Sequence, residues 1–135
     1  MFAGLSFVYV EDDMLSREVM QLMMENAMGV TDLTLFENST DFLIRLDALD
    51  HTPDIILLDI YVRPHDGFDM LKMLRKTPRY NATRIIALTA SVMNEEVEKL
   101  RIAGFDGAIA KPLSVTTFPS LIERIVRGES VWHVT

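Results

Sequence analysis

The sequence predicts an α/β fold in which a doubly wound, five-stranded parallel sheet carries helices on both faces. Two observations predict this class. Short apolar runs alternate five times with longer segments whose apolar residues recur every three to four positions, which is typical of successive strand–helix units. One run, Ile55–Leu58, consists of four consecutive large aliphatic residues, the pattern of a strand buried on both faces.

The composition indicates one globular domain. The chain has 135 residues, of which 49% are hydrophobic, enough for a single core. We find no signal peptide and no apolar run near the roughly 20 residues of a membrane span, and the lack of cysteine is typical of a reducing compartment, so we expect a cytoplasmic protein that does not bind membranes. The net charge is −7 and no Lys/Arg cluster is present, so we expect no nucleic-acid binding by this domain.

The first two strand–helix units occupy the N-terminal part of the chain. Residues 5–10 are rich in aromatic and β-branched residues and predict a strand. The following helix is expected to reach about Met28 and to end before Gly29, with an inward face of Leu15, Val19, Leu22 and Met23. Residues 32–36 predict a strand near a sheet edge. Its helix is expected to be capped by Asn38 or Ser39 and to carry an apolar stripe of Phe42, Leu43, Leu46 and Leu49.

The third and fourth units follow Pro53, which ends the second helix. The buried strand ends on Asp59, and an Asp66-Gly67 turn opens a helix with an inward face of Phe68, Leu71 and Leu74. Residues 85–88 predict the fourth strand. We expect its helix to be capped by Asn94, to face Val97 and Leu100 inward and to end at Gly104.

The fifth unit completes the predicted domain. Residues 108–110 predict a short strand, and the last helix is expected to begin at Ser114 or Thr116 with an inward face of Phe118, Leu121, Ile122 and Ile125. Pro119 predicts that this helix begins late or is distorted there. Gly128 ends it, so we assign residues 1–128 to one domain and residues 129–135 to a short C-terminal tail.

Polar residues follow four of the predicted strands. Five strand–helix units usually adopt the flavodoxin-like order 2-1-3-4-5, which places strand 5–10 beside strand 55–59. Ligands bind in such sheets at the carboxyl ends of the strands. We therefore expect one crevice to contain the residues at those ends, which are Glu11, Asp12, Asp59, Thr89 and Lys111.

These residue types suit phosphoryl transfer. Three neighbouring carboxylates cannot all stay ionised unless a cation joins them, and oxygen ligands in an open crevice favour Mg²⁺. Lys111 and Thr89 can neutralise and position phosphoryl oxygens, and Asp59 is placed to attack phosphorus and form an aspartyl phosphate. A structural alternative applies to the acidic run, because Asp12 or Asp13 can cap the first helix.

The same residues carry a resemblance to a known family. Over about residues 5–127 the chain resembles the response-regulator receiver domain of two-component signal transduction, in particular the chemotaxis regulators. The matching segments have the family's order and spacing, and they are Val10–Asp12, Ser16–Glu18, Pro53–Asp59, Asp66–Gly67, Ala87–Ala90 and Lys111–Pro112.

The resemblance implies a phosphoacceptor regulator in place of an ordinary enzyme. It implies that Asp59 takes a phosphoryl group from a histidine kinase or a histidine phosphotransfer protein, and that Thr89 and Lys111 contact the phosphoryl oxygens. It also implies a Mg²⁺ site formed by Glu11, Asp12, Asp59 and the backbone carbonyl of Tyr61.

The resemblance further implies how the signal is read out. A downstream partner protein would bind the face formed by the fourth helix, the fifth strand and the fifth helix. Tyr61 and Ser91 would tune the lifetime of the phosphoryl group. The chain departs from the family at Arg63, where a proline is usual and Pro64 follows instead. It departs again at Ala108, where an aromatic residue often acts as a switch, and at Pro119.

Two other functions remain open. The chain is also compatible with a receiver-like interaction module that is never phosphorylated. A phosphatase of the haloacid-dehalogenase type would use an Asp nucleophile, Mg²⁺, Thr and Lys as well, but it needs a second acid at the position of Tyr61.

Overall fold

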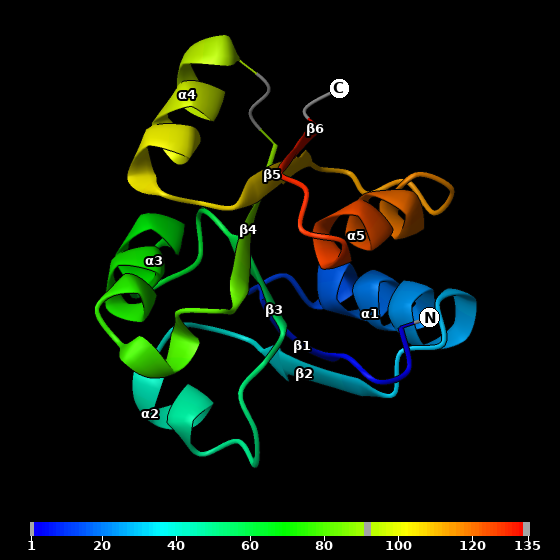
Figure 1. Ribbon diagram of the computed structural model, residues 1–135, viewed down its shortest axis with the longest axis horizontal. Helices are drawn as coiled ribbons and strands as arrows, with labels where there is room; N and C mark the ends of the chain where they lie inside the picture. The colour runs from blue at the N-terminus through cyan, green and yellow to red at the C-terminus, as the bar shows by residue number, and fades with distance from the viewer. Residues whose placement is uncertain (1, 91–92, 134–135) are drawn as a thin grey trace.

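The structure, a computed structural model, describes residues 2–90 and 93–133 (Figure 1). The strands are β1 Ser6–Val10, β2 Asp32–Phe36, β3 Ile55–Asp59, β4 Arg84–Thr89, β5 Gly107–Ala110 and β6 Val131–His133. The helices are α1 Met14–Leu22, α2 Phe42–Asp47, α3 Gly67–Arg75, α4 Asn94–Ala103 and α5 Phe118–Val126, together with a π-helical segment η1 Met23–Ala27 and a 3₁₀ turn η2 Pro78–Tyr80.

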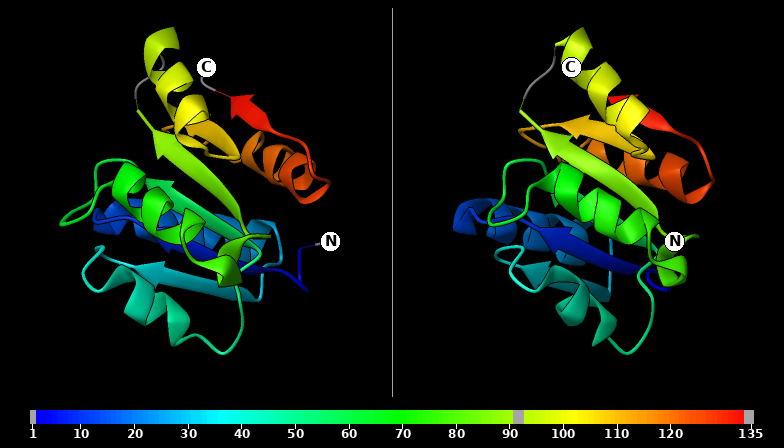
Figure 2. Two further views of the ribbon diagram at one scale, coloured as in Figure 1. Left: turned by 60° about the vertical axis from the view of Figure 1, so that its left-hand side comes forward. Right: turned by 90° about the vertical axis from the view of Figure 1, so that its left-hand side faces the viewer.

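The strands form one parallel sheet in the order β2-β1-β3-β4-β5-β6 (Figure 2). The predicted order 2-1-3-4-5 is confirmed, and β2 lies at an edge as expected. The structure adds a sixth strand, because residues 131–133 of the expected tail pair with β5. A three-residue strand carries too little apolar pattern to be recognised by periodicity.

Side chains alternate between two apolar layers, as the pleat of a strand requires. Phe7, Tyr9, Ile55 and Leu57 belong to the layer under α1 and α5, whereas their neighbours Val8, Val10, Ile56 and Leu58 belong to the layer under α2, α3 and α4. Figure 1 shows the two helical layers on opposite sides of the sheet. The central strands are therefore buried on both faces, and their carboxyl ends share one edge.

The predicted inward face of α1 is wrong at three of its four residues and confirmed at Met23. Leu15 and Leu22 are 66% and 60% exposed and Val19 is also exposed, whereas Met20, Met23 and Met24 are buried. Helix α1 carries two apolar stripes, and spacing alone does not say which one meets the sheet. The helix also continues into the π-helical segment η1, where the Met28 amide donates to the Met23 carbonyl at 3.1 Å. This five-residue spacing changes which side chains share a face, compared with a regular α-helix.

The helix starts agree only in part with the sequence prediction. Asp66 caps α3 through a capping box with Asp69, and α5 begins late, at Phe118, with Pro119 in its first turn. The caps expected for α2 are wrong, because that helix begins after Asp41 without a side-chain cap. Asn94 is the first residue of α4 and does not cap it.

Candidate functional site

Three acidic side chains meet where β1 and β3 end. Glu11, Asp12 and Asp59 offer carboxylate oxygens that all lie within 4.8 Å of one another. Glu11 and Asp59 are buried, with 1% and 6% of their surface exposed, and Asp12 is exposed. The pairing of β1 with β3 produces this arrangement, so the predicted convergence is confirmed. Asp13 does not join it, because its carboxylate caps α1 by accepting from the Ser16 amide at 2.9 Å.

Glu11 is held by two donors on one oxygen. Oε1 accepts a hydrogen bond from Lys111 Nζ at 2.7 Å and another from the Tyr9 hydroxyl at 2.9 Å. Burial alone would raise the pKa of Glu11, but hydrogen bonds from Asp59, Lys111 and Tyr9 lower the pKa to about 2. Glu11 is therefore a fixed anion. Its Oε2 lies 3.3 Å from the Asp13 amide.

Asp59 has the opposite electrostatic character. Burial, followed by its interactions with Glu11, raises the pKa of this carboxyl to about 6. Lys111 Nζ lies 3.6 Å from Oδ2 and offsets part of that shift, and the Tyr61 amide lies 3.4 Å from Oδ1. Burial also acts to lower the pKa of Lys111, but its ion pairs with the two carboxylates raise it, so the lysine stays charged.

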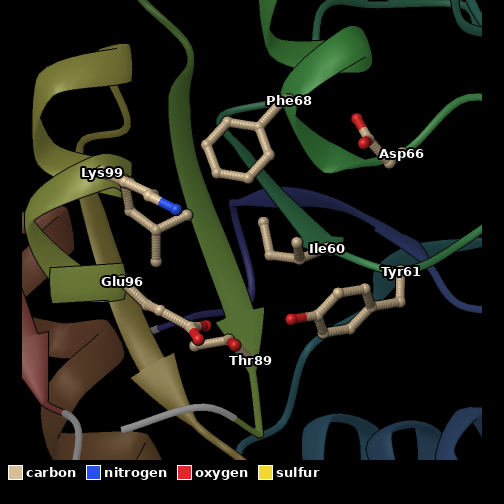
Figure 3. A pocket seen from close by; sticks show the side chains of 8 residues that line it. Ile60, Tyr61, Asp66, Phe68, Thr89, Glu96 and Lys99 are labelled. Carbon is tan, nitrogen blue, oxygen red and sulfur yellow. The ribbon is translucent and has the colours of Figure 1, made fainter. Parts of the chain in front are cut away.

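Thr89 borders a pocket beside this cluster. It is buried at the end of β4, next to Asp59 in the sheet register through Leu88. The pocket has a volume of about 240 Å³ and is lined by Ile60, Tyr61, Asp66, Phe68, Thr89, Glu96, Lys99 and Leu100. Figure 3 shows the hydroxyl of Tyr61 directed toward Thr89, although the Tyr61 side chain is 62% exposed. Ser91 lies outside the described residues.

The loop after Asp59 has a defined path despite its unusual Arg63-Pro64 sequence. The buried Ser39 donates its hydroxyl to the His65 carbonyl at 2.6 Å and accepts from the His65 amide at 2.7 Å. The Ser39 amide also donates to the Arg63 carbonyl at 3.1 Å. Ser39 therefore ties this loop to the segment before α2, which explains why it does not cap that helix.

Sequence reasoning missed Tyr9 and Ser39. A signal for Tyr9 was present, because residues two apart on a strand share a face, and Tyr9 stands two positions before Glu11. No local signal pointed to Ser39, since its partners lie about 26 residues away in the chain.

The chain matches the model of one protein family over residues 7–123, and that family is the response regulator receiver domain. The chain therefore belongs to this family, as the sequence had suggested. Within the described residues no helix is long and apolar enough to cross a membrane.

Two relatives illustrate the match. The polar-differentiation response regulator DivK of Brucella anthropi is 35% identical over 82 residues, which cover 58% of this chain and 67% of that protein. The hybrid signal transduction histidine kinase D of Dictyostelium discoideum is 35% identical over 92 residues, or 64% of this chain but only 6% of that protein.

Solved structures show the same fold. The chemotaxis response regulator CheY4 of Vibrio cholerae superposes with a TM-score of 0.80 at 21% identity, covering 90% of this chain and 98% of that chain. The receiver domain of a DNA-binding response regulator from Colwellia psychrerythraea gives a TM-score of 0.79 at 24% identity, covering 91% and 98%.

Proposed function

We propose that the protein accepts a phosphoryl group on Asp59 from the phosphohistidine of a histidine kinase or a histidine phosphotransfer protein, and that this changes its binding to a partner protein. The observation that carries the proposal is the position of Asp59. It is a buried carboxylate at the end of a central strand, with two further acids within 4.8 Å and a charged lysine 3.6 Å away. Receiver domains work with histidine kinases, so family membership supports the same donor.

The acid cluster fits a magnesium ion. The carboxylates of Glu11, Asp12 and Asp59 would hold it, together with the backbone carbonyl of Tyr61, and bound Mg²⁺ would neutralise charge on phosphoryl oxygens. The raised pKa of Asp59 supports this fit, because burial and then the nearby Glu11 carboxylate both disfavour its ionised form, and a bound cation would favour that form. Tyr9 and Lys111 both bind Oε1 of Glu11, so they hold the carboxylate in one orientation.

The proposed chemistry is a single displacement at phosphorus. An oxygen of the ionised Asp59 attacks, the phosphorus–nitrogen bond to histidine breaks, and the imidazole leaves with the bonding electron pair and takes up a proton. Lys111 lies near enough to Asp59 for its ammonium group to contact an oxygen of the transferred phosphoryl group. Thr89, at the end of β4, would donate a hydrogen bond from its hydroxyl to a phosphoryl oxygen. At neutral pH most Asp59 carboxyls with a pKa of about 6 are ionised and able to attack.

Incorporation of phosphate tests this function. Acetyl phosphate with Mg²⁺ should add one phosphoryl group, seen by intact mass, and Asp59→Asn should abolish the addition. The matched control is Asp41→Asn, since Asp41 is exposed with a positive φ that asparagine tolerates well. Labelling of the control but not of Asp59→Asn supports the proposal. Absence of labelling in the unmodified protein would favour the unphosphorylated module, and rapid turnover without any stable adduct would favour a phosphatase.

A further inference from the structure

Strand β6 fills the outer edge of β5, beside α5 and near α4 (Figure 2). Its residues pair in parallel with β5, with Val131 opposite Gly107 and Trp132 opposite Ala108. Val131 is buried in the apolar layer under α1 and α5, whereas Trp132 packs on the layer under α4. The C-terminal strand therefore joins both layers and covers the edge that β5 would otherwise present.

Two small residues of β5, Gly107 and Ala108, allow β6 to approach closely. A Cβ atom at Gly107 would lie 2.5 Å from the Val131 carbonyl oxygen, so no larger residue at this position is compatible with the observed pairing. Next to it, Ala108 leaves room for the Trp132 ring on the same face. The missing aromatic residue of β5 is thus supplied by the neighbouring strand.

Trp132 also contacts α4. The guanidinium carbon of Arg101 lies 4.6 Å from the centre of the Trp132 ring, within the range of a cation–π interaction. The preceding residue, Leu100, is buried in the same apolar layer as Ala108. Helix α4 therefore contributes to the surroundings of Trp132, through Arg101 directly and through the apolar layer that both share.

Helix α4 is the link between Trp132 and the phosphoacceptor region. Glu96, Lys99 and Leu100 on α4 line the pocket of about 240 Å³ that Thr89 also borders (Figure 3). Of the other lining residues, Ile60 and Tyr61 belong to the loop after β3 and Phe68 belongs to α3, so this pocket borders one side of α4. A strand of three residues at a sheet edge has few backbone hydrogen bonds to break, so its stability depends on side-chain contacts such as those of Trp132.

We propose that the edge of β5 is a strand-docking surface whose occupant in the resting protein is β6, and that phosphorylation of Asp59 releases β6 by moving α4 and Arg101 away from Trp132. The partner is then an extended peptide segment that adds to β5 in parallel, with a β-branched aliphatic residue opposite Gly107 and an aromatic residue opposite Ala108, as β6 itself has. This inference rests on the proposed function, because the release signal is the phosphoryl group.

Trp132 is the single tryptophan of the chain, so its fluorescence reports on β6 directly. The 135-residue protein is treated with acetyl phosphate and Mg²⁺. Labelling, read by intact mass, and acrylamide quenching of Trp132 are measured on the same sample. We expect the quenching constant of the labelled protein to rise about twofold or more, and that of Asp59→Asn to stay unchanged. Labelled protein with unchanged quenching would overturn the release of β6 and leave the proposed function intact. A protein that takes no label would overturn both.

A pair of glycine variants tests the docking geometry without phosphorylation. Gly107→Ala should displace β6 and raise Trp132 quenching, whereas Gly4→Ala should not, because nothing lies within 4 Å of a Cβ at Gly4. Arg101→Ala leaves the core untouched and should give a smaller rise in the same direction. Unchanged quenching in both Arg101→Ala and a folded Gly107→Ala would contradict the proposed contacts.

A peptide with the sequence of residues 129–135 serves as the probe for the partner. Labelled with a fluorophore, it should bind the phosphorylated protein and the Trp132→Ala variant at least about tenfold more tightly than the unphosphorylated protein, because β6 no longer competes. Equal affinity for all three forms would show that β6 does not occupy the docking surface.

Discussion

Lys111 Nζ lies 2.7 Å from Oε1 of Glu11, a carboxylate with only 1% of its surface exposed. The same ammonium group is 3.6 Å from Asp59, so one lysine bridges a proposed metal ligand and the proposed phosphoacceptor. The two carboxyl groups nevertheless differ in pKa. The pKa of Glu11 is low and the pKa of Asp59 is high, and this asymmetry gives the metal-free site a measurable pH dependence.

Ionisation of Asp59 should destabilise the metal-free protein. The folded pKa of about 6 exceeds the unfolded value of 3.8, so this group stabilises the fold below pH 3.8 and loses that contribution as pH rises through 6. At about 1.4 kcal/mol per pKa unit, the loss is on the order of 3 kcal/mol. Glu11 acts oppositely, since its stabilisation is present above pH 4.5 and is lost as pH falls toward 2.

Urea unfolding in EDTA from pH 4.5 to 7.5 measures the contribution of Asp59. The free energy of unfolding should decrease over this range in the unmodified protein and not in Asp59→Asn. Parallel pH profiles for the two proteins would contradict the assignment.

Magnesium should stabilise the protein more at pH 7.5 than at pH 5, because at pH 5 a proton already relieves the repulsion at Asp59. Thermal unfolding with and without millimolar Mg²⁺ measures the difference. Asp12→Asn should weaken the Mg²⁺ effect and change metal-free stability little, since Asp12 is exposed. Identical melting temperatures with and without Mg²⁺ at pH 7.5 would count against the metal site.

Tyr9→Phe should destabilise the protein by roughly 1.5–3 kcal/mol and weaken Mg²⁺ binding, because it removes a hydrogen bond to the buried Glu11 carboxylate. The matched control is Tyr80→Phe. Tyr80 bonds the carboxylate of Asp47, whose side chain is half exposed, so we expect a loss of no more than about 1 kcal/mol and unchanged Mg²⁺ binding. Equal effects of the two variants on Mg²⁺ affinity would show that Tyr9 has no role in positioning Glu11.

The sequence predicted the site better than the periphery. Glu11, Asp59 and Lys111 were expected at one edge because each stands at the end of a strand, and a parallel sheet brings those ends together. The inward face of α1 was misjudged, because two apolar stripes compete there and a π-helical segment changes the register. Strand β6 was not predicted, because it is short and because the residues with which it pairs, Gly107 and Ala108, show no hydrophobic periodicity of their own.

Tyr61 should slow the loss of the phosphoryl group. Its backbone amide lies beside Asp59 and its side chain lines the pocket next to Thr89 (Figure 3), where the ring would restrict the approach of water to the phosphoryl group. Tyr61→Ala should therefore speed dephosphorylation by several-fold, measured as decay of the phosphorylated mass after the donor is removed. Val115→Ala, another exposed position, serves as the control. The same decay rate in Tyr61→Ala and in the control would refute a shielding role.

Direct identification of the phosphorylated residue tests the central proposal most sharply. Borohydride reduces an aspartyl phosphate to homoserine, so reduction of the labelled protein followed by peptide mass spectrometry reads out the acceptor position. We predict homoserine at position 59, in the peptide that contains Ile55–Asp59, and none at Asp12 or Asp13. Homoserine at another aspartate, with position 59 unmodified, would contradict the account.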